Sequence, residues 1–198
     1  MISKRGFYPM KMSKIAAVAL LVMLNGAAAA GYAAQEEQVQ VQEEVQAKAD
    51  EEQAADIKAI IAGNEAYQKH DLTNALKFYR QAIELNEQST PAHINCGVVL
   101  RESGRLEEAL AEFKIAQHLE PENRVVYLSL GLTHVEMQKY QEAIEDYSKA
   151  VELDAEEPLA YMNRGILYRN NRQYEAAAAD FTKVIELRAE GGRAYKER

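Results

Sequence analysis

Small and apolar residues recur every 34 positions along the chain from residue 56 onward. Glycines, alanines, aromatic residues and leucines each keep this spacing through four successive appearances. The glycines are Gly63, Gly97, Gly131 and Gly165, and the alanines are Ala75, Ala109, Ala143 and Ala177. The aromatic residues are Tyr79, Phe113, Tyr147 and Phe181, and the leucines are Leu85, Leu119, Leu153 and Leu187. A period of this length is typical of repeat architectures, in which each unit buries its apolar face against its neighbours.

Each 34-residue unit has the pattern of two amphipathic helices joined by a short turn. The units are 56–89, 90–123, 124–157 and 158–191. The small residue at position 8 and the alanine at position 20 allow the two helices to approach closely, and the aromatic residue at position 24 fills the remaining space. Pro91 and Pro158 stand at the start of first helices, where the missing N–H of proline costs nothing. The sequence therefore predicts an all-α fold of four helix pairs.

These units resemble the tetratricopeptide repeat (TPR), a helix–turn–helix motif with the same period. The resemblance rests on the small, alanine and aromatic positions above, the small residue at position 27 and the leucine at position 30. It departs from the family at position 4, where Ala59 and His93 replace the usual aromatic residue, and at position 32, where only Pro121 is proline. The resemblance implies a right-handed α-solenoid of four units. Residues 192–198, with Tyr195 at position 4 of a further first helix, are expected to begin a short capping helix.

The first 33 residues have the pattern of a secretory signal peptide. Four cations precede the apolar run Ile15–Leu24, and small residues follow it. This order is typical of bacterial export signals, and the small residues allow cleavage after Ala30 or Ala33. The alternative is an uncleaved anchor, because residues 15–34 reach membrane-spanning length when the alanines are counted. In both cases we expect a periplasmic or secreted bacterial protein, which touches the membrane only if the segment is retained.

Residues 34–55 form an acidic, Gln/Glu-rich spacer. Lys48 is its one cation, and its sizeable apolar residues are Val39, Val41 and Val45. Val41 and Val45 are one helical turn apart, which permits a weak amphipathic helix that folds back onto the repeats or pairs with another copy. The other interpretation is a solvated, partly disordered segment, which the excess of like charge favours.

Composition and charge exclude several classes of function. The formal net charge is −8, so binding to nucleic acids through the phosphate backbone is not expected. The single cysteine, Cys96, excludes an internal disulfide and a multi-cysteine metal site, and its position in a first helix indicates a core residue. The sequence contains no nucleophile–base arrangement, phosphate loop or H-E-x-x-H pair, and its four histidines lie in different helices or turns. We therefore predict a non-catalytic protein without cofactor or metal.

The candidate binding surface lies on the first helix of each unit. Positions 2, 5, 9 and 12 form a stripe that is separate from positions 4, 8 and 11, which pack on the second helix. In TPR proteins this stripe lines the concave groove where peptides bind, and the resemblance implies the same use here. The alternative is that neighbouring first helices bury it between repeats. The candidate groove residues, including asparagines that offer both donors and acceptors to an extended backbone, are Ile60, Asn64, Tyr67, Ile94, Asn95, Val98, Arg101, Leu128, Leu132, Met162, Asn163, Ile166 and Arg169.

The carboxylate clamp of chaperone-cofactor TPR domains is not expected in this chain. Asn64 and Asn95 match the two asparagines of that clamp, but Ile60 replaces its first lysine. Val125 and Ser129 stand at the basic positions of the third unit. Two neutral amides without a cation hold a carboxylate weakly, because charge-assisted hydrogen bonds are the strong ones.

The predicted function is a non-catalytic scaffold or adaptor for protein–protein interaction. It would bind an apolar or amphipathic segment of a partner in the groove, in envelope assembly or secretion. One alternative is a periplasmic holding chaperone for exported subunits. Another is a self-associating module and hence a homo-oligomer, in which the groove takes residues 34–55 or a second copy.

Overall fold

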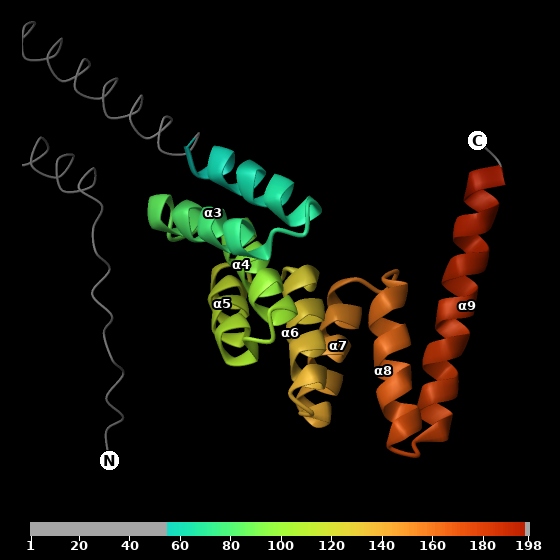
Figure 1. Ribbon diagram of the computed structural model, residues 1–198. Coiled ribbons are helices and arrows are strands. Elements are labelled where there is room, and N and C mark those ends of the chain that lie inside the picture. The colour runs from blue at the N-terminus through green and yellow to red at the C-terminus, as the bar shows by residue number, and fades with distance from the viewer. Residues whose placement is uncertain (1–54, 197–198) are drawn as a thin grey trace, which may run out of the picture. The chain divides into compact units, whose positions relative to one another are not determined.

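The computed structural model describes the backbone of residues 55–196 and the side chains of residues 55–189. Within this range the chain is helical apart from short turns (Figure 1). A helix over 55–68 is followed by α3 (Leu72–Leu85), α4 (Thr90–Glu102), α5 (Leu106–Leu119), α6 (Arg124–Glu136), α7 (Tyr140–Leu153), α8 (Pro158–Asn170) and α9 (Tyr174–Lys196). None of these described helices combines the length and apolarity that crossing a membrane requires. The predicted signal peptide and nearly all of the acidic spacer lie outside the described residues.

Consecutive helices form four antiparallel pairs that stack in the order of the sequence. Within a pair the two helices pack against each other, as in α4–α5, α6–α7 and α8–α9. Between pairs, α3 contacts α4, α5 contacts α6, α7 contacts α8, and the first helices α4 and α6 also touch. The all-α fold of four helix–turn–helix repeats is confirmed, and α4, α6 and α8 start at the predicted unit boundaries 90, 124 and 158.

The turn inside each pair uses one residue with a left-handed backbone. These residues are 34 apart and have φ values between 58° and 74°: His70, Gly104, Gln138 and Arg172. The next N–H then donates to a carbonyl five residues earlier, as from Asp71 to Ala66 at 2.9 Å. This arrangement is a Schellman motif, which satisfies carbonyl groups at the end of the first helix. Three of the four repeats form it without glycine, although a side chain makes this conformation costly.

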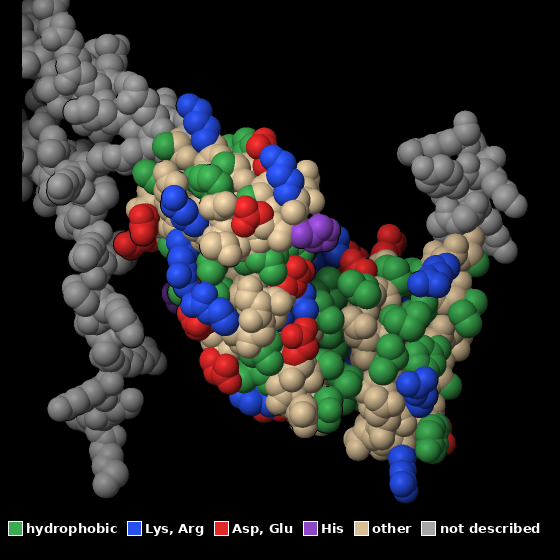
Figure 2. Space-filling model, in the orientation of Figure 1, with side chains coloured by type: hydrophobic (Ala, Val, Ile, Leu, Met, Phe, Trp, Pro, Cys, Tyr) green, Lys and Arg blue, Asp and Glu red, His purple; other side chains and the backbone are tan. Residues whose placement is uncertain are grey.

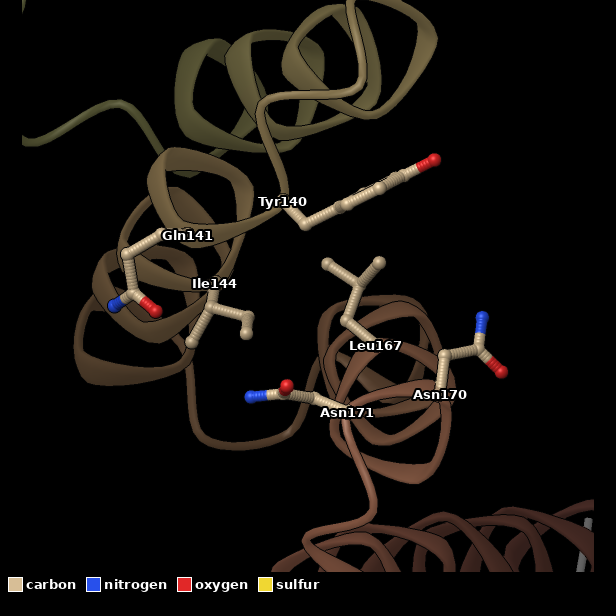
Figure 3. A pocket seen from close by; sticks show the side chains of 6 residues that line it. All are labelled: Tyr140, Gln141, Ile144, Leu167, Asn170 and Asn171. Atoms are coloured by element: carbon tan, nitrogen blue, oxygen red, sulfur yellow. The ribbon is translucent and has the colours of Figure 1, made fainter.

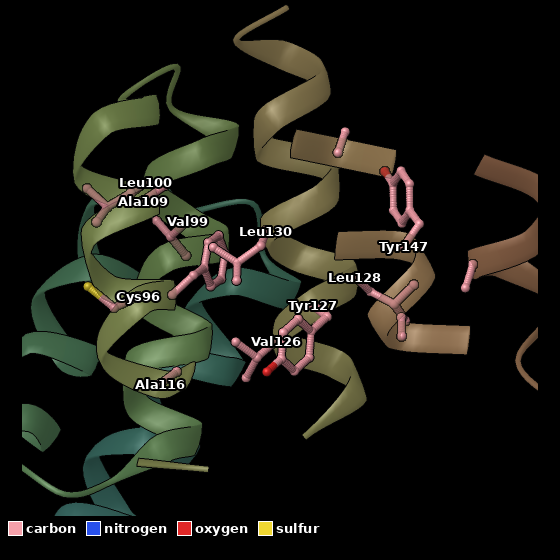
Figure 4. Close-up of a cluster of buried hydrophobic side chains, with 14 of the residues drawn as sticks. Cys96, Val99, Leu100, Ala109, Ala116, Val126, Tyr127, Leu128, Leu130 and Tyr147 are labelled. Carbon is pink, nitrogen blue, oxygen red and sulfur yellow. The ribbon is translucent and has the colours of Figure 1, made fainter. Parts of the chain in front are cut away.

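The core fills the space inside each pair and between successive pairs. The aromatic side chains of Tyr79, Phe113 and Tyr147 are at most 2% exposed. Each lies over the glycine at position 8 of its own repeat, so that a Cβ added at Gly97 would lie only 2.6 Å from Cε1 of Phe113. Figure 4 shows the middle of this core, with Cys96 among apolar neighbours. The predicted packing of position 24 against position 8 and the core placement of Cys96 are both confirmed.

Partly buried contacts between an acid and a histidine or arginine join the two helices of the second, third and fourth repeats. The acid stands at position 23 in each case, on the second helix, and its partner comes from the first helix. The pairs are His93–Glu112 at 2.7 Å, His134–Asp146 at 2.6 Å and Arg164–Asp180 at 2.8 Å. His93 and His134 are therefore packing residues, whereas His70 lies in a turn and His118 is exposed.

The C-terminal end differs from the sequence prediction. α9 continues through Gly191 and Gly192 to Lys196, so no separate capping helix begins at residue 192 in the described part of the chain. Each glycine weakens a helix by about 1 kcal/mol, which is less than the cost of a proline or the effect of a competing turn. Neither occurs here, and the surrounding residues favour a helix. α9 consequently has 23 residues, whereas α7 has 14.

Candidate protein-binding site

The first helices present a surface that we call the first-helix face, formed by positions 2, 5, 9 and 12 of each repeat. Its outer row is apolar and exposed. At position 2, Ile57 is 49% exposed, Val125 42% and Leu159 47%, and Pro91 is exposed as well. Because apolar side chains at the surface of soluble proteins are usually scattered, a row with one such residue in every repeat is unusual.

The floor of the first-helix face is half-buried. Ile60, Ile94 and Val98 pack against the core and keep part of their surface exposed. The corresponding residues of the third and fourth repeats are also half-buried: Leu132, Met162 and Ile166. Neighbouring repeats therefore bury part of the stripe, as the alternative interpretation expected. Leu128, by contrast, is only 8% exposed and belongs to the core, so this predicted groove residue lies below the surface.

The inner edge of this face carries a polar ladder between repeats. Position 12 of one repeat donates to a glutamate at position 13 of the next. The Tyr67 hydroxyl donates to Glu102 Oε1 at 2.5 Å, and Arg101 Nη1 donates to Glu136 Oε1 at 2.5 Å. Arg169 stands at the same position in the last repeat and is exposed. Of the two candidate arginines, Arg101 is thus engaged with Glu136, while Arg169 faces solvent.

Two of the predicted asparagines lie together between the first and second repeats. The Asn64 carbonyl oxygen accepts from the Tyr79 hydroxyl at 2.7 Å and from Asn95 Nδ2 at 3.3 Å. Burial raises the pKa of Tyr79 to about 12, so the phenol remains a donor at neutral pH. This contact occupies one carbonyl and one amide N–H, and a ligand backbone could use the remaining amide groups.

The third asparagine occupies the equivalent place between the third and fourth repeats. Asn163 and Tyr147 stand 68 residues beyond Asn95 and Tyr79, but Leu132 replaces the acceptor that Asn64 provides. Among the described residues, the buried Asn163 Nδ2 and Tyr147 hydroxyl have no hydrogen-bond partner. Burial and the nearby charge of Asp146 raise the pKa of Tyr147. Both junctions thus contain an asparagine and a tyrosine at equivalent positions. At the first junction these groups are hydrogen-bonded through Asn64, and at the second they have no such partner in the described part of the chain.

A cavity of about 320 Å³ lies between α7 and α8 at the junction of the third and fourth repeats (Figure 3). Its apolar walls come from Ile144, Leu167 and the ring of Tyr140, which is 52% exposed. Carboxamides complete the lining: Gln141, Asn170 and Asn171. The lining carries no charge, which favours a neutral or apolar group over an ion.

Sequence reasoning missed three features of this surface. The exposed row at position 2 belongs to the predicted stripe, and its apolar character is visible in the sequence. The two ladder glutamates, Glu102 and Glu136, each lie 35 residues after their donor in the sequence. This spacing indicates a contact only once the stacking of the repeats is known. The cavity has no sequence signal, since its shape depends on the outward direction of the Tyr140 ring (Figure 3).

Metal and cofactor chemistry find no support in the described residues. No group of three or more His, Cys, Asp or Glu side chains there is arranged to hold a metal ion. The thiol of Cys96 is fully buried, and burial raises its pKa to about 12, so it is neither a nucleophile nor a ligand at neutral pH.

Comparison with known proteins agrees with this architecture. Solved structures with the same fold include MamA 41-end from Desulfovibrio magneticus RS-1 (22% identity, TM-score 0.64), where the match covers 89% of this chain and 94% of the solved chain. The Arabidopsis OM64 TPR domain (24% identity, TM-score 0.59) covers 60% of this chain and 98% of that domain. The first TPR of Spaghetti (RPAP3), bound to an HSP90 peptide, matches at 16% identity and a TM-score of 0.59, over 60% of this chain and 94% of its own. No curated protein sequence matches significantly.

Family models match most of the repeat region. One described as tetratricopeptide repeat matches residues 66–130, another described as TPR repeat matches 133–171, and a third, again tetratricopeptide repeat, matches 159–190. Together they span more than half of the chain and nearly all of the four helix pairs. TPR proteins mediate protein–protein interactions and are typically non-catalytic scaffolds. The chain is a tetratricopeptide repeat protein.

Proposed function

We propose that this protein is a non-catalytic adaptor that binds an apolar or amphipathic segment of a partner protein along the first-helix face. The observation that carries the proposal is the exposed apolar row at position 2. Three of its members, Ile57, Val125 and Leu159, are each between 42% and 49% exposed. Covering such side chains removes apolar surface from water and stabilises a complex by about 25 cal/mol per Å².

The chemistry of the face suits an amphipathic segment. The apolar row and the half-buried floor would take the apolar side of the segment. The opposite edge, with its Arg101–Glu136 and Tyr67–Glu102 contacts, would meet the polar side, where charged groups set orientation more than affinity. Val125 and Ser129 are neutral residues at the positions where the carboxylate clamp carries cations, so they supply no charge for a terminal carboxylate. The partner is therefore recognised through an internal apolar segment.

The test compares two substitutions that introduce the same charge at similar exposure. Leu159→Arg changes the position 2 row, while Ile115→Arg changes an isoleucine of α5 that is 42% exposed and lies off the first-helix face. Each variant is used as bait in envelope extracts and the captured proteins are identified by mass spectrometry. We expect Leu159→Arg to lose a partner that wild type and Ile115→Arg retain. Equal capture by all three baits would contradict the proposal.

The number of captured proteins distinguishes the adaptor from a holding chaperone. An adaptor retains one or two proteins, whereas a chaperone for exported subunits retains many unrelated ones through the same face. A third arrangement, in which residues 34–55 occupy the face, is tested by deleting residues 35–54. If that deletion increases the capture of partners, the segment competes for the face; if capture is unchanged, it does not.

The proposal includes export to the periplasm or the outside of a bacterial cell, and its support is the sequence of residues 1–33 alone. The basic region, the apolar run and the small residues predict cleavage after Ala30 or Ala33. Cell fractionation followed by N-terminal sequencing of the mature chain tests this. A mature chain that begins at Gly31 or Ala34 supports cleavage, and an intact N-terminus in the membrane fraction supports the anchor. Recovery of the intact chain in the cytoplasm would overturn export.

A further inference from the structure

The last helix of the repeat stack leaves an apolar face exposed. In the first and third repeats, the isoleucine and valine at position 28 of the second helix, Ile83 and Val151, are half-buried and pack against the core. The residue at this position in α9 is Ile185, and it is 69% exposed. Tyr174 is 60% exposed on the same helix, and Ala178 stands exposed where Ile144 of α7 is buried. Positions 21 and 28 of α9 therefore continue the interface through which one repeat covers the next. Tyr174 extends this apolar surface at a position that is also exposed in α7, where Tyr140 is 52% exposed.

The first repeat ends the stack differently, with polar residues. Position 3 carries the exposed Lys58, whereas the later repeats bury Ala92, Val126 and Ala160 there. Position 10 carries the exposed Glu65, whereas the later repeats bury Val99, Thr133 and Leu167. Polar outer faces are how terminal repeats stay soluble. Head-to-tail stacking of chains would bury Lys58 and Glu65 against the apolar face of α9, and desolvation of these charges opposes it.

The exposed stripe of α9 alternates large and small side chains in a self-complementary order. Tyr174, Ala178, Ile185 and Ala189 lie within about 60° of one another around the helix, at 100° per residue. If a two-fold axis passes between Phe181 and Thr182, an antiparallel second α9 sets Tyr174 opposite Ala189 and Ala178 opposite Ile185. Each large side chain then faces a small one, which is the arrangement that close helix packing requires.

We propose that two copies of this chain form a symmetric dimer through the exposed faces of α9. The contact is isologous, because both copies use the same patch. Such a contact forms a closed dimer and does not add further copies. Hydrophobic side chains also gather on the side of the molecule that α8 and α9 form, at the right of Figure 2. The proposed contact uses no residue of the first-helix face, so it does not depend on the function proposed above.

The first test measures the mass of the full-length chain by analytical ultracentrifugation over a range of concentrations. We expect wild type to reach twice the chain mass and no more. Ile185→Arg places two charges in the small interface and should weaken dimerisation by at least about tenfold, since 1.4 kcal/mol corresponds to a factor of ten. Ile115→Arg is the matched control and should leave the dimer unchanged. A single-chain mass for wild type, or growth beyond two copies, would overturn the proposal.

The second test uses the position of the two-fold axis. Thr182 is exposed beside that axis, so Thr182→Cys brings two thiols close together in the dimer, while the native Cys96 is fully buried and unreactive. A short bismaleimide should link Thr182→Cys chains into dimers. Ala111→Cys, at an exposed position of α5, is the control and should link only by random collision. Equal yields from both variants would show that α9 is not the contact.

Discussion

A Cβ atom at Gly131 would lie 2.6 Å from Cε1 of Tyr147, a distance at which no side chain fits without displacing the ring. The same relationship joins Gly63 to Tyr79, Gly97 to Phe113 and Gly165 to Phe181. A glycine on the first helix and an aromatic residue sixteen positions later thus form one unit of packing. Because Tyr147 is fully buried, the ring has little room to move.

The first prediction concerns this contact. Gly131→Leu should lower the free energy of unfolding by about 1–3 kcal/mol, because the added side chain overpacks a filled core. Urea unfolding followed by circular dichroism measures the change. Combining the substitution with Tyr147→Ala provides the control, since the leucine can then occupy the space of the ring. The double variant should lose less stability than the two single changes added together, and simple additivity would show that the two positions do not compete for space.

The glycine–aromatic contact could be predicted from the sequence because both partners belong to one repeat and recur with its period. The helix boundaries follow for the same reason. The continuation of α9 through Gly191 and Gly192 could not be predicted, since glycine lowers helix stability without fixing where the helix ends.

The candidate binding surface was predicted in part. The stripe of first-helix positions is a local property, but the exposure of each member depends on its neighbours. Leu128 and Leu159 both read as apolar stripe residues, yet one is 8% exposed and the other 47%. Contacts between repeats, such as Arg101 to Glu136, join residues 35 apart and become visible only when the stacking is known.

The second prediction follows from the turns between paired helices. Gln138 has φ of 60°, a conformation that costs a side chain roughly 1–2 kcal/mol and costs glycine less. Gln138→Gly should therefore raise the unfolding free energy by about 0.5–1 kcal/mol, after the greater entropy of glycine in the unfolded chain is subtracted. Gly104→Gln is the reverse change at the equivalent turn, where nothing lies within 4 Å of the added Cβ. It should destabilise through backbone strain alone. Opposite signs for the two variants in thermal unfolding are the expected result.

The third prediction separates core from surface on the first helices. Leu128→Arg introduces an unpaired charge at a buried site and should lower the unfolding free energy by about 3–5 kcal/mol, the range for an uncompensated buried charge. Leu159→Arg should change it by less than about 1 kcal/mol, because its side chain already faces solvent. Thermal unfolding of both variants measures the difference. If Leu128→Arg melts like wild type, Leu128 contributes to the binding surface after all.

The fourth prediction is a pH dependence of stability that arises at His93. Burial alone would lower the pKa of this histidine, but its hydrogen bond with Glu112, the Glu87 carbonyl and the Glu112 charge outweigh burial, and the pKa is raised above its ordinary value of 6.5. Folding therefore binds a proton here. The resulting stabilisation is fully present below pH 6.5 and is lost as the pH rises through the higher pKa of the folded state.

Urea unfolding of wild type and His93→Gln between pH 5.5 and 8.5 measures this effect. His93 and Glu112 are 5% and 22% exposed in their side chains, so solvent screens their contact only in part. We expect the stability advantage of wild type over His93→Gln to be largest at the acidic end and to shrink steadily toward pH 8.5. Because glutamine keeps a hydrogen bond but carries no charge, the variant isolates the proton-linked part of the contact. An advantage that stays constant would show that folding leaves the pKa of His93 unchanged, and one that grows with pH would show that folding lowers it. Either result would contradict the prediction.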